Sequence, residues 1–596
     1  MHTATGRISM TLAGALLASA LAMPAMAESP VTDERLANAD SEPQNWLTTG
    51  QNYGGNRYSR LDEINTSNVA NLRVAYTFPI SSVFAGRSGS VIDTNPLVDE
   101  GIMYFEDGQG VFYKIDVSAG NTTSLVWTAD ATVAKDVGGA TRGFALLDNM
   151  LVKCMGDGRT VAIDRDSGDF LWDVQRMGID HPGSAGINVE SEGCTGGTMA
   201  MGGHVIVANG FGDGGNRGYV EALDASNGDE LWRWYAIPGP GEAGHETWAD
   251  DHNAWKTGGA GMWTAGTYDP ESRLTYWGTA NPVPMFDPEF RPGDNLYTDS
   301  LVVLDIDTGE LAWYFQYVPN ESWDYDENGV HMLLDGNRVA HFARNGFFYQ
   351  FDRTTGEFLS NGQYVDELNW TSGLDPKTGL PVEFNPDLDV QEYIPETRWL
   401  RGETLDENAI TCPNLTGGVR WQYPAYNPDT GIAYAAASDG CFKIEVVPAV
   451  SLGPDGGFDD EAASIHGFHG DFAAVVIDDS TGAFLLGAMW AVDANANQLL
   501  ATHQRPFVYE SGVTVTAGGL VLTSTIDGWV FAHDAETLEV LWEFDMGTPS
   551  RGTPISFAVD GKQYIAVIAS ANPPAGTFQG STRNMTSGAA LYVFTL

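Results

Sequence analysis

One short unit recurs along this 596-residue chain and constrains its fold more than any other feature. The unit consists of two apolar residues, an aspartate, a few turn-forming residues that often end in glycine, and a short run that a tryptophan closes. Apolar strands with Asp/Gly turns and a packing tryptophan at a fixed place predict stacked antiparallel sheets. The clearest copies are Asp164 with Gly168 and Trp172, Asp224 with Gly228 and Trp232, and Asp305 with Gly309 and Trp313, and weaker copies surround Asp116, Asp352, Asp493 and Asp534.

The spacing of these units predicts the architecture. Most of the aspartates follow one another at intervals of roughly 40 to 80 residues, which suit one four-stranded propeller blade with insertions. The longer interval between Asp352 and Asp493 predicts one or two further blades. Helical periodicity is scarce, and 70 glycines fit a turn-rich all-β protein. We therefore predict a single eight-bladed β-propeller with tryptophans packed between blades, although the repeats alone also allow seven blades.

The ends of the chain and its irregular stretches complete this prediction. We expect the segment near residues 45–80 to join the C-terminal strands and close the ring. Insertions at residues 236–262, 283–299 and 360–410 are expected to be loops, which often carry function. Residues 1–27 combine a basic start, a short apolar core and an A-x-A-like cleavage site, so they predict a signal peptide ahead of one domain over residues 28–596. The expected location is the periplasm, because no later stretch approaches the roughly 18 apolar residues of a membrane span.

Charge and cysteine content narrow the function. The formal net charge of -49, from 30 basic and 79 acidic residues, excludes general affinity for nucleic acid and favours cationic partners or bound cations. Four cysteines in an exported chain predict two disulfides, and the sequence allows three pairings. We favour Cys154–Cys194 and Cys412–Cys441, because neighbours in sequence tend to be neighbours in space. The sequence contains no C-x-x-C-H motif, so we expect no covalently attached haem of the c type.

The segment 321–329 crowds four carboxylates together, those of Glu321, Asp324, Asp326 and Glu327. Such charges repel one another unless they are solvated or a positive group lies among them. If the segment is extended, Asp324 and Asp326 point to the same side, because strand side chains alternate. Two carboxylates on one side suit a hard cation. An acidic surface turn is the alternative interpretation.

Further motifs occur in a fixed order along the chain. They are Asn45-Trp46, Arg57-Tyr58-Ser59, Trp263 with Tyr268-Asp269-Pro270, Gly278-Thr279-Ala280-Asn281-Pro282, Trp323-Asp324-Tyr325, Arg344-Asn345-Gly346-Phe347-Phe348-Tyr349 and Thr516-Ala517-Gly518-Gly519-Leu520. In this order they resemble the pyrroloquinoline quinone (PQQ)-dependent alcohol dehydrogenases, including the large subunits of methanol and ethanol dehydrogenases. That family is an eight-bladed propeller with PQQ and a metal on its axis. The resemblance implies oxidation of an alcohol by hydride transfer to PQQ, with electrons passed to a soluble cytochrome c.

The resemblance also implies metal ligands. Asp324 matches the family's catalytic base and, with Asn281, its metal ligands, although Asn281 can also be interpreted as a turn residue. Asp213 stands where the family usually has glutamate. Asp326 resembles the extra aspartate of the lanthanide-dependent branch, where calcium enzymes have Ala, Ser or Thr. Three carboxylates and one amide supply the negative oxygen that a trivalent cation needs, so a lanthanide is favoured and Ca²⁺ is the alternative.

Five residues match the cofactor contacts of the family. Trp263 matches the indole on which the quinone lies, Arg142 and Arg344 match cationic contacts, Asp93 stands where a glutamate contacts the cofactor, and Thr195 matches a hydroxyl donor. PQQ is a flat tricarboxylate, so an aromatic platform and arginine forks suit it. The alternative interpretations are a blade tryptophan for Trp263 and surface ion pairs for the two arginines.

The chain departs from the family pattern in three places. The adjacent cysteines of many members are absent from residues 135–142, so the lid over the quinone must differ. Arg420 stands where the family often has asparagine, and we expect it beside the cofactor. Glu510 stands in place of tryptophan, and it could form a salt bridge with Arg420 or help to grip a substrate, a structural role being the alternative. Glu321 and Glu327 are expected to be solvated charges.

Other functions remain open on the sequence. The missing cysteine pair suggests a bulky secondary or polymeric alcohol, or a sugar, as an alternative substrate for the same cofactor. A non-catalytic propeller scaffold would lack the ordered set of arginines, aspartates and Trp263. The sequence determines neither the substrate nor the oligomeric state, and a homodimer is among the options.

Overall fold

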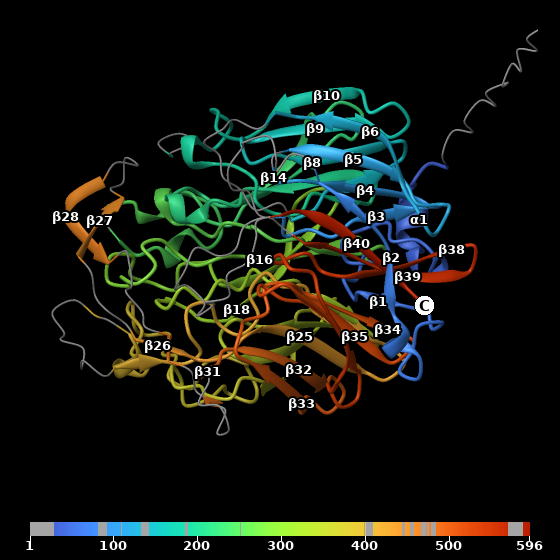
Figure 1. Ribbon diagram of the computed structural model, residues 1–596. Helices are drawn as coiled ribbons and strands as arrows, with labels where there is room; N and C mark the ends of the chain where they lie inside the picture. Colours follow the sequence, from blue (N-terminus) through green and yellow to red (C-terminus); the bar gives the residue numbers. More distant parts are fainter. Residues whose placement is uncertain are drawn as a thin grey trace, which may run out of the picture.

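The structure is a computed structural model in which we describe residues 29–80, 92–108, 110–132, 142–184, 187, 189–250, 252–398, 400, 409–443, 448–452, 458–465, 472–473, 476–477, 484–569 and 588–596. The described residues form eight sheets of four or five strands, arranged as the blades of a propeller (Figure 1). The predicted eight-bladed, all-β architecture is therefore confirmed. The predicted signal peptide lies outside the described residues.

Six blades are each built from four consecutive strands that hydrogen-bond in chain order. They are β3 (Leu97–Asp99), β4 (Ile102–Glu106), β5 (Val111–Asp116) and β6 (Ser124–Asp130); β7 (Ala145–Leu147), β8 (Met150–Cys154), β9 (Arg159–Asp164) and β10 (Phe170–Gln175); β11 (Met199–Met201), β12 (His204–Ala208), β13 (Tyr219–Leu223) and β14 (Glu230–Tyr235); β15 (Thr267–Asp269), β16 (Leu274–Gly278), β17 (Ser300–Asp305) and β18 (Leu311–Gln316); β19 (Met332–Leu334), β20 (Arg338–Phe342), β21 (Phe347–Asp352) and β22 (Phe358–Gln363); β34 (Val513–Thr516), β35 (Leu520–Ser524), β36 (Trp529–Asp534) and β37 (Val540–Asp545).

The blade that closes the ring combines the two ends of the domain. Its strands β38 (Ile555–Val559), β39 (Lys562–Ala569) and β40 (Ala590–Thr595) continue into β2 (Arg73–Pro79), which pairs with β40 in antiparallel register. The short strand β1 (Tyr58–Ser59) adds in parallel to β34. The expected closure by residues 45–80 is confirmed, and it removes the free edges that an open row of blades would have.

The eighth sheet consists of β24 (Ala425–Asn427), β25 (Ile432–Ser438), β32 (Gly487–Asp493) and β33 (Gln498–Arg505). Asp493 ends its third strand, so the long interval after Asp352 belongs to this one blade and the prediction of extra blades there is wrong. The described strands of the insertions instead form small sheets, from β23 (Ile410–Thr411), β26 (Cys441–Lys443) and β29 (Phe472–Ala473), from β27 (Pro448–Leu452) and β28 (Phe458–Ile465), and from β30 (Val476–Ile477) and β31 (Phe484–Leu485). Repeat spacing misled here because insertions lengthen a blade without adding one.

The predicted loops lie between these strands. Residues 236–262 contain only the 3₁₀ turns η6 (His245–Thr247) and η7 (Ala254–Thr257) among their described residues, and residues 283–299 contain no helix or strand. The third predicted loop starts late, because β22 continues to Gln363, and it contains η8 (Pro395–Thr397). The remaining short helical elements are α1 (Asp33–Ala37), η1 (Ala39–Ser41), η2 (Val69–Asn71), η4 (Val189–Ser191) and η5 (Gly212–Gly214).

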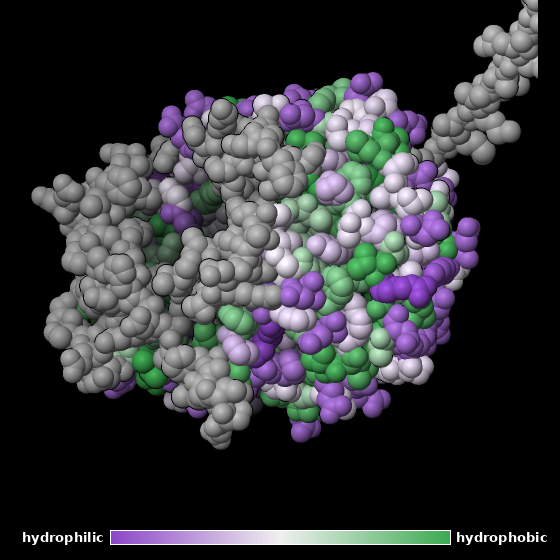
Figure 2. Space-filling model, in the orientation of Figure 1, coloured by the Kyte–Doolittle hydropathy of each residue, from purple (hydrophilic) through white to green (hydrophobic). Residues whose placement is uncertain are grey.

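Each blade is buried at its inner edge and partly exposed at its outer edge. All three residues of β7 are buried, whereas exposed and half-buried residues occupy β10. The inner strands of neighbouring blades contact one another, as β7 contacts β11 and β24 contacts β34. Over the described part of the visible surface, hydrophobic and hydrophilic residues are interspersed (Figure 2). No helix within the described residues is long and apolar enough to cross a membrane.

The repeat tryptophans dock one blade onto the next. Trp313 on β18 donates its indole N–H to the Arg353 carbonyl of the following blade at 3.2 Å. Its ring also covers Gly356, which has a φ of 76° and whose Cβ, if it had one, would lie 2.6 Å from the ring. The repeat therefore needs glycine both for its left-handed conformation and for this contact. Equivalent indole bonds join Trp127 to Arg165, Trp172 to Ala225 and Trp232 to Ile306.

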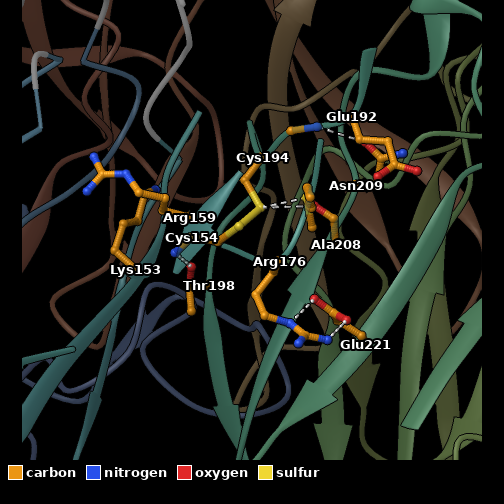
Figure 3. The surroundings of a disulfide bond; sticks show 12 residues. Lys153, Cys154, Arg159, Arg176, Glu192, Cys194, Thr198, Ala208, Asn209 and Glu221 are labelled. Carbon is orange, nitrogen blue, oxygen red and sulfur yellow. Dashed lines mark hydrogen bonds and ion pairs between the residues drawn. A yellow bond between two sulfur atoms is a disulfide. The ribbon is translucent and has the colours of Figure 1, made fainter. Parts of the chain in front are cut away.

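Two disulfides connect segments within and between blades. Cys154, at the end of β8, is bonded to Cys194 in the segment that precedes β11. Figure 3 shows this disulfide beside Thr198, whose hydroxyl accepts the Cys154 N–H at 2.8 Å. The second disulfide joins Cys412 to Cys441. Both favoured pairings are confirmed, and both are consistent with an oxidising, extracytoplasmic compartment.

Candidate functional site

Most of the predicted site residues share one place in the blade. They lie a few residues before the innermost strand, where the chain crosses from one blade to the next near the axis. The set comprises Asp93 before β3, Arg142 before β7, Thr195 before β11, Trp263 before β15, Asp324 and Asp326 before β19, Arg420 before β24 and Glu510 before β34. Because the blades surround one axis, residues that are hundreds of positions apart meet in one ring.

Three further predicted residues lie in the turns between the second and third strands of their blades. Asp213 lies between β12 and β13, Asn281 between β16 and β17, and Arg344 between β20 and β21. In an antiparallel blade, the entry to the first strand and the turn between the second and third strands open at the same end. Both sets therefore face the same end of the propeller.

Arg344 connects the predicted metal-binding aspartates. Its guanidinium forms an ion pair with Asp326 and lies 3.4 Å from the carboxylate of Asp324. The other carboxylate oxygen of Asp326 accepts the backbone N–H of Asn281 at 3.1 Å. Arg344 also donates to the Leu415 carbonyl at 2.6 Å, and it is almost fully buried. The alternative interpretation of Arg344 as a surface ion pair is therefore wrong.

The backbone places Asp324 differently from the expected extended segment. Residues 321–329 form no strand, and Asp324 adopts a φ of 67°, a left-handed conformation that non-glycine residues seldom occupy. The carboxylates of Asp324 and Asp326 nevertheless lie close together, because both pair with the guanidinium of Arg344. Strained backbone of this kind is found preferentially at functional sites, where the surrounding structure holds it in place.

Electrostatic repulsion among the carboxylates is strong at this point. Burial raises the pKa of Asp324 well above its ordinary value, Arg344 opposes the rise, and Asp326 and Asp213 add to it. Burial together with the charge of Asp326 also raises the pKa of Asp213 to about 6. Asn281 donates a hydrogen bond to Asp213, which counteracts the shift.

The expectation that Glu321 and Glu327 are solvated is wrong. Both side chains are fully buried. Glu321 accepts the backbone N–H groups of Trp323 and Tyr325, the latter at 3.0 Å, and burial raises its pKa to about 7. These bonds hold the turn that carries Asp324.

Glu327 fixes a second loop of the site. Its carboxylate accepts the backbone N–H groups of Arg344 at 2.8 Å and Asn345 at 3.1 Å, and it lies 3.1 Å from a ring nitrogen of His341. Both glutamates therefore shape the loops that present the aspartates and Arg344. The sequence shows only a run of acidic residues, in which burial cannot be told from exposure.

Trp263 forms the centre of a second cluster at the same end of the propeller. The guanidinium carbon of Arg142 lies 4.6 Å from its ring centroid, and that of Arg420 lies 5.9 Å away. Arg142 also donates to the carbonyls of Thr195 at 3.1 Å and Trp263 at 3.3 Å. Trp263 precedes its blade's innermost strand instead of lying on an outer strand, so it is not a repeat tryptophan. Arg142 is buried, and it is not a surface residue.

The structure adds Arg551, which the sequence analysis missed. Arg551 lies 3.5 Å from Asp93 and 3.5 Å from Glu510, while Arg142 lies 3.8 Å from Asp93. Burial raises the pKa of Asp93, and the charges of Arg551 and Arg142 oppose the rise. The position of Arg551, four residues before the start of β38, repeats the offset of the other site residues, and this offset could have identified it.

The expected salt bridge between Arg420 and Glu510 is not formed. Glu510 pairs with Arg551 instead, and Arg420 makes no ion pair with any residue of the described chain. Gly417, three residues earlier, has a φ of 68° and packs against the Arg344 side chain, where a Cβ would collide. The glycine-rich segment before Arg420 therefore lets two arginines approach the same site.

The residues fit a hard cation and a flat anionic cofactor. Asp213, Asp324 and Asp326 carry three negative charges when ionised, and Arg344 offsets one of them. The remaining net negative charge is one that a bound cation can neutralise. Asn281 adds a neutral oxygen. Within the described ranges, no three His, Cys, Asp or Glu side chains stand close enough together to enclose a metal as they are. The fit therefore rests on donor chemistry and on the raised pKa values of Asp213 and Asp324.

The fold and the site define a class of quinone-dependent dehydrogenase. A family model described as "PQQ: Glucose/ethanol/alcohol dehydrogenase, beta-propeller domain" matches residues 46–363 and 477–565. The chain therefore belongs to the PQQ-dependent alcohol dehydrogenases, oxidoreductases that act on CH–OH groups.

Individual relatives match nearly the whole chain. The quinohemoprotein alcohol dehydrogenase ADH-IIG of Pseudomonas putida is 32% identical and covers 96% of this chain and 79% of its own. The lanthanide-dependent methanol dehydrogenase of Methylacidiphilum fumariolicum (strain SolV) is 30% identical over 90% of this chain and 86% of its own. Among solved structures, a europium-containing methanol dehydrogenase superposes with a TM-score of 0.80 at 28% identity, covering 94% of this chain and 100% of that one.

Proposed function

We propose that this protein oxidises a primary or secondary alcohol, bulky ones included, to an aldehyde or ketone, with Asp324 as the base. The observation that carries the proposal is that Asp324 and Asp326 meet on Arg344 at the same end of the propeller as Trp263. When bound, PQQ supplies the quinone that accepts the hydride of the alcohol. Asp324 accepts the hydroxyl proton at its carboxylate.

The charge of the site controls when Asp324 can act as a base. Burial raises its pKa, so the isolated carboxylate tends to hold its proton. Arg344, 3.4 Å away, favours the ionised form, and a cation held by Asp213, Asn281, Asp324 and Asp326 would favour it further. A cation bound there would therefore keep Asp324 ionised and able to accept the hydroxyl proton.

We propose a lanthanide as the resident metal, with Ca²⁺ as the alternative. Asp326 supports this proposal because it adds a third carboxylate to the donor set. It also already pairs with Arg344, so its oxygen lies at the site and not at the surface. The similarity to the lanthanide-dependent methanol dehydrogenase of Methylacidiphilum fumariolicum gives independent support.

The cofactor would be held by a set of groups with complementary roles. Trp263 offers the flat platform, Arg142 and Arg420 flank that ring with guanidinium groups, and Asp93 and Thr195 lie beside Arg142. Arginine suits carboxylates because its planar fork donates two parallel hydrogen bonds. Arg344 would contact the cofactor from the side on which the predicted metal ligands Asp324 and Asp326 lie.

The surroundings of the enzyme follow from its chemistry. We propose a periplasmic location, consistent with the two disulfides and the predicted signal peptide. Electrons would leave to a soluble cytochrome c, for which the net charge of -49 favours a basic partner. A homodimer remains a proposal. Within the predicted lid, residues 135–142, only Arg142 is part of the described structure, so a sugar or polymeric alcohol stays the alternative substrate.

A substrate panel tests this function. Purified protein is supplied with PQQ and either Ca²⁺ or La³⁺, and reduction of an artificial electron acceptor is followed with primary, secondary and polymeric alcohols and a sugar. We expect alcohol-dependent turnover, faster with La³⁺. Turnover with the sugar or polymer alone would favour the alternative substrate, and no turnover with any of them would refute the proposed function.

The metal assignment has its own test. Replacing Asp326 with Ala removes one of three carboxylates, and we expect about tenfold or greater loss of La³⁺-supported activity with a smaller loss for Ca²⁺. The measurement is kcat/KM with each metal at saturation. Asn281→Ala, which removes a neutral donor, is the matched control and should affect both metals. Equal losses in Asp326→Ala would contradict the lanthanide assignment.

A further inference from the structure

Three guanidinium groups and two carboxylates gather in the site beside Trp421 and Trp263. The guanidinium carbons of Arg142 and Arg551 lie 5.5 Å and 6.0 Å from the Trp421 ring centroid, and that of Arg420 lies 5.9 Å from the Trp263 centroid. Asp93 and Glu510 are the carboxylates, and both are buried. The two carboxylates balance two of the three arginines, so the group retains one positive charge in a strongly acidic protein.

Arg551 engages both carboxylates at once. One of its terminal nitrogens lies 3.5 Å from Asp93 and the other lies 3.5 Å from Glu510. Its neighbours therefore constrain both ends of its planar fork. A forked guanidinium can hold two separate carboxylates in this way, which a point charge such as lysine does less well.

Arg420 is left without an acidic partner. Its side chain makes no ion pair or hydrogen bond to any residue in the described part of the chain, and its Nε is buried. The charges of Glu510 and Asp326 act on it, but neither carboxylate pairs with it. Arg420 is half-buried, and a buried donor such as its Nε is costly to leave without a hydrogen-bonding partner unless a ligand supplies one.

We propose that Arg551 is a positioning residue that retains Glu510 and thereby leaves Arg420 available to bind a ligand carboxylate. The inference rests on the proposed alcohol dehydrogenase function and adds the substrate class. The carboxylate belongs either to an alcohol substrate that is also an acid or to the cofactor. In the first case, the enzyme prefers hydroxy acids to neutral alcohols of the same chain length.

The test compares the single variant Arg551→Gln with the double variant Arg551→Gln/Glu510→Gln. In the single variant, Glu510 is released and captures Arg420, so carboxylate binding should weaken about tenfold. In the double variant, position 510 has no charge to capture Arg420, so binding should recover. A merely structural role of Arg551 would not be rescued by a second substitution. Arg551→Lys keeps a positive charge beside Glu510, so it should weaken carboxylate binding less than Arg551→Gln does.

Two measurements on holoenzyme distinguish the sources of the carboxylate. The first is the ratio of kcat/KM for 4-hydroxybutanoate and 1-butanol. The second is the Kd of the metal-loaded protein for PQQ, measured by absorbance titration in the absence of substrate. A fall in the ratio that the double variant reverses assigns the carboxylate to the substrate. A rise in the Kd for PQQ that the double variant reverses assigns the carboxylate to the cofactor.

The proposal is overturned if neither quantity changes in Arg551→Gln, or if the double variant is no better than the single one. Arg505→Gln is the matched control. Arg505 forms a comparable ion pair, 2.7 Å long, with Asp527, and neither residue belongs to this cluster. It should leave both quantities as in the parent protein. If the parent protein oxidises neither alcohol, the proposed function fails first, and the 1-butanol measurement shows this independently of Arg551.

Discussion

The blade turns and the axial site use the same side chain, aspartate, in opposite ways. In the turn between β13 and β14, the carboxylate of Asp224 accepts the backbone N–H of Ser226 at 2.8 Å and the Ser226 hydroxyl at 2.6 Å, and these bonds lower the pKa of Asp224. At the axis, burial raises the pKa of Asp324 well above its ordinary value. The turn aspartate is ionised and solvated at neutral pH, whereas the site aspartate needs an added positive charge.

This difference separates a structural repeat from a site. A turn aspartate satisfies its charge locally, so it recurs from blade to blade without reference to the rest of the fold. The site aspartates depend on Arg344, which comes from another strand connection. Their charge state is therefore a property of the assembled ring. The predictions below change one region at a time.

The largest effect is expected at Asp324. Replacing it with Asn keeps the size of the side chain but removes the proton acceptor, and we expect turnover to fall by about 10² to 10⁴-fold. PQQ binding, measured by absorbance titration, should persist, because Trp263 and Arg142 are unchanged. Asp224→Asn, the same substitution in a blade turn, should leave kcat unchanged. Retained activity in Asp324→Asn would exclude this residue as the base.

A smaller effect, on stability alone, is expected where blades dock. In Gly356→Ala the new Cβ would meet the Trp313 ring at 2.6 Å, in addition to the strain at a φ of 76°. We expect a loss of about 2–3 kcal/mol in the free energy of unfolding, measured by chemical denaturation. Gly561→Ala is the matched control, because its φ is 78° but its Cβ would meet nothing within 4 Å. Equal losses in the two variants would mean that tryptophan docking contributes little.

The smallest effect concerns pH. The pKa of Glu321 rises from an ordinary 4.5 to about 7, so its folded form binds the proton more tightly than its unfolded form. Its contribution to stability is therefore greatest below about pH 4.5 and is lost as the pH rises to about 7. In metal-free protein, Glu321→Gln should remove roughly 1–2 kcal/mol of this pH dependence. The measurement is the Tm between pH 4.5 and 7.5.

The turn aspartates provide the opposite control for the pH experiment. The pKa of Asp224 is lowered in the folded state, so its stabilisation is present above its ordinary value of 3.8 and is lost as the pH falls below it. Asp224→Asn should therefore alter the Tm only in acid and leave the interval between pH 4.5 and 7.5 unchanged. If both variants behaved alike, burial would not be the cause of the difference between the two regions.

Much of the fold could be predicted because its determinants are local. The Asp–Gly turn and the closing tryptophan of a repeat lie within about ten residues, and each repeat is sufficient to specify one hairpin and one docking contact. The insertion after Asp352 misled the spacing argument for the same reason. A repeat reports the strands beside it, but it carries no information on how long the connection to the next repeat is.

The candidate site was only partly predictable. Motif resemblance identified Asp213, Asn281 and Asp324, whose neighbours in sequence are distinctive, but it missed Arg551, whose surroundings are not. Glu321 was misjudged because solvation depends on what packs over a segment, and here loops from distant positions bury it. Pairing partners could not be deduced for Glu510, which meets Arg551 and not Arg420.

The sequence by itself determined the class of fold and the family, because turns, packing residues and motifs are encoded over short distances, and it favoured the two disulfide pairs that the structure shows. Only the tertiary structure decided which charges meet at the axis. Closing the ring through β2 and β40 brings the blade entries from Asp93 to Arg551 around one centre. There, burial removes water from the carboxylates of Glu321 and Asp324 and strengthens every interaction between charges, so their state depends on partners that lie far away in the sequence.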